Sequence, residues 1–300
     1  MIKALFPALK NQARFKPEEM AAALDEEYFS RYLIAPRRWA ADKLETYGIA
    51  CGLLSGFGGF LSEEFRAHDY GLGRANCYQF LKEHFALPKE NQIIHDGYLN
   101  SRAKDYVKFR PNSGSQEYYQ IIPVLPTSPV PPLGWPKIER RTVEDLVAAA
   151  KDRAKALVKK ALADKMVKPA AFRVGLRALW WVWGEDKVAE FVRWSVLSDL
   201  IRRDQLNWLT AGKPESERKV MAALADPAYD LRTPEGIAAR ERLEGNIVSQ
   251  VLATYKDVIW WDKDRNACTL DERKPSLLSR LTGVGEPTVD WEDARGQLHE

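Results

Sequence analysis

The residues most able to do chemistry lie in one stretch, "GFGGFLSEEFRAHDYGLGRANC", which runs from Gly56 to Cys77. Its first turn contains Gly56, Gly58 and Gly59. The backbone N–H groups of such a turn could bind an anion at the start of a helix. However, no Lys-Ser or Lys-Thr pair follows, as a phosphate-binding P-loop requires. We therefore expect these glycines to permit tight backbone packing.

A serine nucleophile is the second chemistry to consider, because Ser55 stands directly before these glycines. A nucleophile elbow needs Gly-x-Ser-x-Gly, since small flanking residues allow the strained turn between a strand and a helix. The spacing around Ser55 does not match, and the sequence contains no Gly-x-Ser-x-Gly anywhere. We expect the serines here to act in turns or caps.

Two His-Asp steps, His68-Asp69 and His95-Asp96, could be taken for catalytic dyads. Neighbouring residues of a helix point about 100° apart and do not face each other. We expect Asp69 to cap a turn before the next helix, and His95 to lie in an exposed polar loop. An enzyme built around Asp69, His68 or His95 stays an alternative, although no nucleophile is evident for it.

The composition is that of a globular protein and excludes several other classes. The 300 residues are 45% apolar and 29% charged, and 45 basic residues nearly balance 42 acidic ones. This balance gives no argument for a polyanion partner. The three cysteines and four histidines show no disulfide or metal spacing, so we expect no metal and no cofactor. No secretory signal or apolar window of ~20 residues is present, which predicts a cytoplasmic protein, with peripheral membrane contact as an alternative.

The N-terminal part is expected to mix helices and extended segments. A helix is predicted at 16–24, followed by a buried strand at 47–60 that enters the glycine turn and by a short helix capped by Ser62. A further helix is predicted at 74–85, with four residues of one face on the core: Cys77, Phe80, Leu81 and His84. A strand at 117–126 and an extended, proline-rich connector at 123–136 complete this part.

The character changes to long helices after Arg141. Residues 143–162 predict one helix, and residues 171–208 predict two amphipathic helices joined near Gly184. The apolar stripe of the second is expected to be Val188, Phe191, Trp194, Leu197 and Ile201. Eight of the ten tryptophans follow Pro136, and we assign them to a core or a domain interface.

Residues 216–274 predict three helices followed by a hairpin around the turn "DKDRN", which is the order of a winged helix. Thr233 is the expected N-cap of the second helix, with Pro234 at its first position. A DNA reader should present basic side chains on its third helix. The expected third helix, 243–255, offers Glu244, Asn246, Ser249 and Gln250, and no Lys or Arg before Lys256. A protein-interaction or dimerisation role is therefore favoured over nucleic-acid binding.

Four segments together resemble bacterial patatin-like phospholipases. They are "NQARFKPEEMAAAL", "SRYLIAPRRW", "GIACGLLSGFGGFLSEEFRAHDYGLGRANCYQFLKEHFALP" and "YYQIIPVLPTSPVPPLGWP". The resemblance covers residues 1–140 and is to the portion that follows the catalytic core. The helical part after Arg141 is similar to the less regular C-terminal extension of the same proteins.

This resemblance implies an α/β acyl-hydrolase fold that cleaves ester bonds of phospholipids. The family uses a Ser-Asp dyad, in Gly-x-Ser-x-Gly and Asp-Gly-Gly/Ala, and a glycine-rich oxyanion loop. None of these is present, and Asp96-Gly97 stands on the wrong side of the glycine block. No catalytic residue is therefore assigned. The positions that match the family block are expected to be structural, holding a buried turn against the sheet: Gly56, Gly58, Gly59, Arg66, Asp69, Gly73, Arg74 and Asn76.

The fold class expected from all of this is α/β, mostly helical. The expected domains are a patatin-like C-terminal lobe at 1–140, a helical region at 141–212, a winged-helix-like unit at 213–282 and a tail at 283–300. The leading hypothesis is the C-terminal portion or split subunit of a patatin-like lipid acyl hydrolase, inactive alone. Its expected partner is a catalytic chain or a second copy of itself, or a peripheral membrane lipid. The alternative is a non-catalytic module that binds a protein or nucleic acid through the winged-helix-like end.

Overall fold

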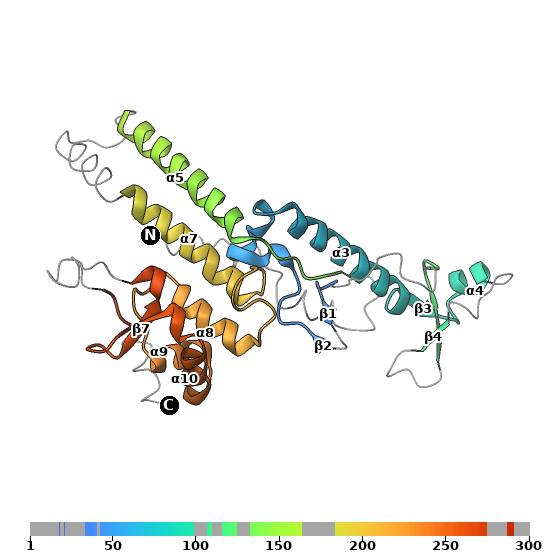
Figure 1. The fold of residues 1–300 in the computed structure, drawn as a ribbon. Coiled ribbons are helices and arrows are strands. Elements are labelled where there is room, and N and C mark those ends of the chain that lie inside the picture. The colour runs from blue at the N-terminus through green and yellow to red at the C-terminus, as the bar shows by residue number, and fades with distance from the viewer. Residues whose placement is uncertain are drawn as a thin grey trace. The chain divides into compact units, whose positions relative to one another are not determined.

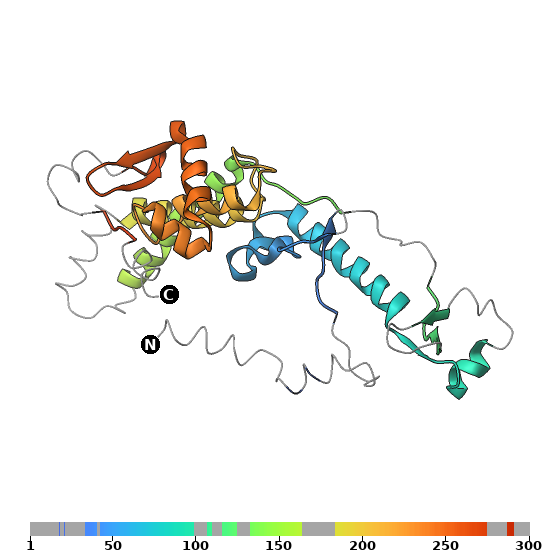
Figure 2. The same cartoon turned by 90° about the horizontal axis from the view of Figure 1, so that it is seen from below.

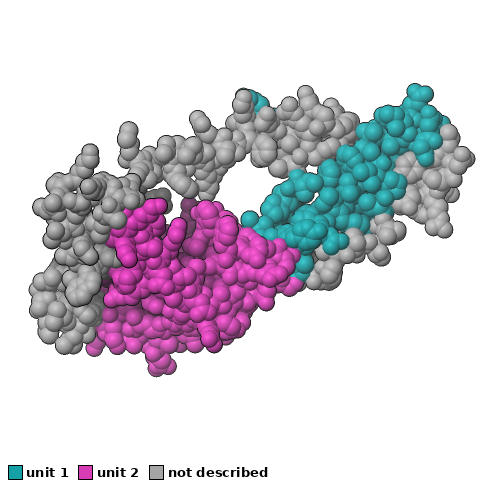
Figure 3. All heavy atoms as spheres, turned by 90° about the horizontal axis from the view of Figure 1, so that it is seen from above, with its two compact units in different colours: residues 1–49, 69–133 teal, residues 50–68, 134–300 magenta. Residues whose placement is uncertain are grey.

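A computed structural model describes Glu18, Ala21 and residues 34–40, 43–98, 107–109, 116–124, 133–163, 184–274 and 287–290. These residues are mostly helical, with a few short strands (Figure 1 and, from below, Figure 2). The mostly helical character predicted from the sequence is confirmed. The chain divides into two compact units, coloured separately in Figure 3. Unit 1 comprises residues 1–49 and 69–133, and unit 2 comprises residues 50–68 and 134–300.

Several predicted segments fall outside the described residues. They include the middle of the connector at 123–136, the first of the two helices at 171–208 and most of the tail at 283–300. They also include most of the helix at 16–24, of which only Glu18 and Ala21 are described, and both are helical. The predicted domain boundaries stay predictions.

Unit 1 contains short strands and one long helix. Its elements are β1 (Trp39–Ala40), β2 (Lys43–Leu44), most of α3 (Glu63–Glu83), β3 (Ala86–Pro88), α4 (Gln92–Tyr98), β4 (Val107–Phe109) and β5 (Glu117–Gln120). An antiparallel sheet has the strand order β3–β5–β4. Gln120 is buried, and its amide donates to Lys82 O at 3.3 Å and accepts from Val124 N at 3.0 Å. The strand predicted at 117–126 is thus confirmed over its first four residues.

The buried strand predicted at 47–60 is wrong. Two 3-10 helices, η1 (Ala50–Gly56) and η2 (Gly58–Phe60), take its place. Leu54, Ser55 and Gly56 have positive φ angles of 50°, 61° and 108°. Left-handed residues cannot continue a strand, so the chain turns back on itself here. Of the apolar side chains that suggested a strand, Ala50 and Leu53 are instead fully buried in the core of unit 2, to which residues 50–60 belong.

The turn predicted between the short helix after Ser62 and the helix at 74–85, which spans Gly71 and Gly73, is also wrong, because α3 runs through it without a break. Ser62 does cap this helix, since its Oγ accepts from Glu64 N at 3.1 Å. Gly71 is needed for packing instead: a Cβ there would lie 2.8 Å from Leu133 Cδ2. The prediction that Cys77 and His84 pack on the core is wrong, because both residues are exposed.

Unit 2 is a helical assembly with a hairpin. Its remaining elements are α5 (Arg140–Ala163), α7 (Glu185–Arg202), α8 (Glu215–Ala225), α9 (Pro234–Glu241), α10 (Gly245–Thr254), η5 (Lys256–Val258), β6 (Ile259–Asp262), β7 (Ala267–Leu270) and η6 (Asp271–Arg273). In Figure 1, α7 lies beside both α5 and α8, and these pairs make the most extensive helix contacts of the unit. The helices and the hairpin predicted for 216–274 are confirmed as elements.

The core of unit 2 forms where α7 meets α8. Val220 to Ala225 of α8 are fully buried, and three of these six side chains are small: Ala222, Ala223 and Ala225. Ser198 Oγ on α7 donates to Ala222 O at 2.8 Å. Of the stripe predicted on α7, Trp194, Leu197 and Ile201 are buried, whereas Phe191 is 61% exposed. Helical spacing therefore located the buried face of α7 from Trp194 onward.

Candidate functional site

The loop at residues 50–60 is held by the C-terminal end of α7. Asp199 Oδ2 accepts from Leu54 N at 2.8 Å, and Arg203 Nη2 donates to Gly52 O at 2.9 Å. Just after the helix, Gln205 Nε2 donates to Ala50 O at 3.0 Å. Backbone groups that could have faced a ligand are thus hydrogen-bonded to side chains of another helix. The buried turn of this loop rests on a helix, not on the sheet that we expected.

The glycines of this loop permit close packing. A Cβ on Gly58 would lie 2.7 Å from Leu53 Cβ and 3.0 Å from Cys51 O. A Cβ on Gly59 would lie 3.1 Å from Cys51 Sγ. Contacts this close exclude any larger residue without rearrangement, which agrees with the packing role expected for them.

The other residues of the family-like block lie along α3 and contact different partners. Arg66 donates to Gly59 O and, at 3.4 Å, to Ser62 O, so it ties the helix start to the loop. Arg74 lies 5.9 Å from the centre of the Tyr70 ring. Asn76 Nδ2 donates to Leu72 O one turn back, at 2.9 Å. Gly73 has open space around it, and Asp69 lies within the helix and not at a cap.

The candidate catalytic histidines lie in ordinary environments. His68 is buried, and its ring meets Trp135 edge-on with 5.2 Å between ring centres. His95 is exposed as expected but lies within α4 and not in a loop, and its Nδ1 lies 3.3 Å from Asp96 Oδ1. Ser55 is exposed and belongs to the left-handed turn. These surroundings are those of a packed core histidine, a surface histidine and a turn serine.

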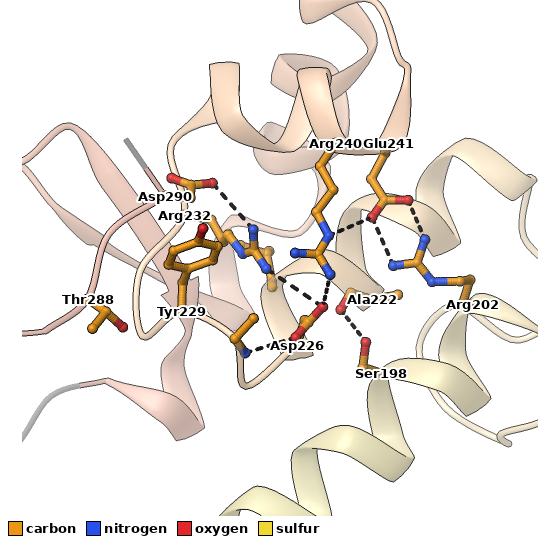
Figure 4. A network of polar contacts seen from close by, with 12 residues as sticks. Ser198, Arg202, Ala222, Asp226, Tyr229, Arg232, Arg240, Glu241, Thr288 and Asp290 are labelled. Atoms are coloured by element: carbon orange, nitrogen blue, oxygen red, sulfur yellow. Dashed lines mark hydrogen bonds and ion pairs between the residues drawn. The ribbon is translucent and has the colours of Figure 1, made fainter. Parts of the chain in front are cut away.

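A network of buried charges in unit 2 is the most developed polar site of the described residues (Figure 4). Its centre is Arg232, which is only 1% exposed. The Arg232 guanidinium lies 3.7 Å from Asp226 Oδ2 and 3.7 Å from Asp290 Oδ2. It also lies 4.5 Å from the centre of the Tyr229 ring, in cation–π geometry.

The network extends from Arg232 towards α7 with alternating charge. Arg240 pairs with Asp226, and its Nε lies 3.9 Å from Glu241 Oε1. Arg202 forms a two-pronged ion pair with Glu241, with Nη2 to Oε1 at 2.8 Å. Figure 4 shows the resulting order Arg202, Glu241, Arg240, Asp226, Arg232, Asp290. Each interior member is shared by two opposite charges, so the loss of one would leave others buried without compensation.

Burial perturbs the ionisable groups around this network. Desolvation raises the pKa of Asp290, although its bonds from Thr233 and the charge of Arg232 act against the shift. Desolvation lowers the pKa of the Arg273 guanidinium, which donates to Tyr229 O at 3.0 Å and to Asp226 O at 3.1 Å. The buried Cys268 thiol has its pKa raised to about 12, so it is protonated and unreactive at neutral pH.

Two cavities open beside α7. One of about 490 Å³ adjoins the network, and one of about 750 Å³ lies between α5 and α7. The smaller is lined by Leu54, Phe191, Ser195, Ser198, Asp199, Arg202, Asp226, Pro227, Ala228, Arg240 and Glu241. Its arginines and carboxylates are already paired with one another, and Ser198 donates to a backbone carbonyl. This lining holds no histidine that could activate a serine.

Two further properties concern the described residues as a whole. Nowhere among them do three or more His, Cys, Asp or Glu side chains gather as a metal site would require. In the same part of the chain, no helix combines the length and apolarity needed to cross a bilayer.

Sequence reasoning found one member of this site, the Thr233 cap, and missed the rest. Thr233 Oγ1 accepts from Gly236 N at 3.0 Å, as the Thr-Pro-Glu-Gly pattern predicts. Arg232, Asp226 and Asp290 gave no local signal, because Asp290 stands 57 residues after Thr233.

Comparison with known proteins gives one informative match. A protein of Sinorhizobium fredii (strain NBRC 101917 / NGR234), named uncharacterized protein y4iI, is 35% identical to this chain over 301 aligned positions. The alignment covers 91% of this chain and 42% of that protein, so the chain spans about two fifths of its relative's length. No family model and no solved structure matches the chain.

Proposed function

We propose that this chain is a non-catalytic portion, or split subunit, of a patatin-like lipid acyl hydrolase. One observation carries the proposal: the glycine-rich loop of the family-like block is hydrogen-bonded to Asp199 and Arg203 of α7. A loop held in this way is scaffold, and the Leu54 N–H, already bonded to Asp199, is unavailable to stabilise an oxyanion. The chain would complete or regulate a hydrolase whose serine and aspartate lie elsewhere.

The length of the relative is consistent with this proposal. More than half of the y4iI protein lies outside its alignment with this chain, which leaves room there for a further domain. In our proposal the partner is a catalytic chain or a second copy, the substrate is a membrane lipid, and the location is the cytoplasm or the inner membrane surface.

The test is labelling of the purified chain with a fluorophosphonate probe, with intact mass as the readout. We expect no adduct and no hydrolysis of phospholipid or p-nitrophenyl ester, because an acyl-enzyme needs an activated nucleophile. A single stoichiometric adduct would refute the proposal. Ser55→Ala and Ser195→Ala variants would then show whether the labelled serine is the one before the glycines or the one in the cavity beside α7.

A second candidate function is a protein-docking module of winged-helix type. The backbone at Arg232 pairs antiparallel with Cys268 of β7, with N···O distances of 2.8 and 2.7 Å. From α8 to β7 the order is then helix, bridged segment, helix, helix, strand, strand, which matches the element order of a winged helix. The exposed residues of α10 are Asn246, Ser249, Gln250, Ala253 and Thr254, together with Gly245, and none is charged. Salt-dependent binding of duplex DNA would favour nucleic acid over protein as its partner.

A further inference from the structure

Residues 230–233 pair with a segment that lies far along the chain, residues 287–290. Leu231 pairs in parallel with Val289, on the side away from β7. The backbone N–H groups of Asp230 and Leu231 both donate to Thr288 O at 3.0 Å. Residues 287–290 therefore cover the open edge of the small sheet formed by β6, β7 and residues 231–232. An edge covered in this way resembles the mode by which extended peptides join a sheet.

Two side chains of residues 287–290 are held specifically. Thr288 donates to Asp230 Oδ2 through its N–H at 2.9 Å and its Oγ1 at 3.0 Å. Asp290, fully buried, accepts at Oδ1 from Thr233 N at 2.7 Å and from Thr233 Oγ1 at 3.0 Å. Its other oxygen faces Arg232 at 3.7 Å. The carboxylate thus lies at the N-terminus of α9, where the helix dipole favours a negative charge.

Gly236 provides an independent sign that this position is shaped for a carboxylate. It lies in the first turn of α9, and glycine is less favourable than alanine in a helix. A methyl group on Gly236 would overlap the carboxylate of Asp290. The missing side chain therefore creates the space that the acid occupies.

We propose that residues 230–233 and the first turn of α9 form a binding site for an extended peptide with the pattern Thr-x-Asp. In this chain the site is filled in cis by Pro287–Asp290. Main-chain bonds to residues 230 and 231 supply affinity, and Asp230, Arg232 and Thr233 select the threonine and the acid. Residues 275–286 connect the site to its occupant. A tether of this length gives an effective concentration on the order of millimolar, so a free peptide competes poorly while the tether is intact.

The test uses the full chain with a protease recognition site inserted between Lys274 and Pro287. After cleavage, we expect the C-terminal fragment to separate on gel filtration while the body keeps its helical circular dichroism. A fluorescein-labelled synthetic peptide of residues 284–293 should then bind the cleaved body, and it should bind the uncut chain at least about tenfold more weakly. The same peptide with Asp290→Ala should also bind at least about tenfold more weakly, because it leaves the Thr233 N–H without its acceptor and Arg232 without one of its two counter-charges.

A matched pair of glycine variants separates site recognition from general stability. Gly236→Ala in the cleaved body should abolish peptide binding, whereas Gly245→Ala, which has open space at the start of α10, should leave the Kd unchanged. The proposal is overturned if the fragment leaves only when the body unfolds, because residues 287–290 would then be an integral part of the fold. It is equally overturned if the folded body fails to rebind the peptide, or binds the Asp290→Ala peptide as well as the parent.

Discussion

The loop at residues 50–60 and the network around Arg232 are both held by charged side chains of unit 2, but in different ways. In the loop, Asp199 and Arg203 bind backbone groups and are themselves paired at 3.0 Å. In the network, charged side chains bind one another, and its centre is buried. The loss of a loop contact leaves a neutral backbone group without its partner, whereas the loss of a network member leaves a buried charge without its counter-charge. The network should therefore be the more sensitive of the two to single substitutions.

The largest effect is expected for Arg232→Ala. The substitution leaves the Asp290 carboxylate buried without its counter-charge and removes the contact with Tyr229. We expect a loss of about 3–5 kcal/mol in the free energy of unfolding. Chemical denaturation followed by circular dichroism measures it.

Lys274→Ala is the control for this substitution, because its ion pair with Asp271 is half exposed on both sides. It should lose less than about 1 kcal/mol. Equal losses of stability in the two variants would show that the network is no more sensitive to substitution than a surface ion pair, and would refute its greater sensitivity.

A smaller effect is expected in the loop, for Gly58→Ala. The added methyl group would lie 2.7 Å from Leu53 Cβ, and overpacking of this kind costs about 1–3 kcal/mol. Gly73→Ala is the matched control, since it has open space within α3 and should gain about 0.5–1 kcal/mol from its helix propensity. Thermal melts of the two variants should therefore shift in opposite directions. A rise in Tm for both would show that the loop glycines are not needed for packing.

The smallest effect concerns a neutral donor bound to a carboxylate, a third kind of contact in unit 2. Tyr255 Oη donates to Glu217 at 2.7 Å, and burial, followed by this bond, raises the pKa of Tyr255 to about 12. Because the folded pKa lies above the ordinary value of 10, the stability from this contact is complete below pH 10. It is lost as the pH rises through about 12.

Ultraviolet titration of tyrosinate absorbance checks this expectation. The parent chain should show a late step near pH 12 that Tyr255→Phe lacks. A difference between the two that appears near pH 10 instead would mean that Tyr255 is solvated and only weakly bound to Glu217.

Much of the helical architecture could be predicted from the sequence, because caps and spacing act within a few residues. Thr233 and Ser62 cap the helices that they were expected to cap, and the hairpin closes at its predicted polar turn. The same local reasoning failed at Gly71–Gly73. There a packing contact with Leu133 explains the glycine better than a turn does.

Only the tertiary structure showed what the polar residues do. The apolar run at 47–60 forms a turn because Asp199, Arg203 and Gln205, about 150 residues later, bind its backbone. The network likewise joins residues from Arg202 to Asp290, and burial alone makes their pairing strong. Local propensities reach one or two helical turns, whereas charge pairing and desolvation depend on which distant residues share the interior. The sequence alone therefore determined most of the helices and the hairpin, and the folded chain decided where the charges meet.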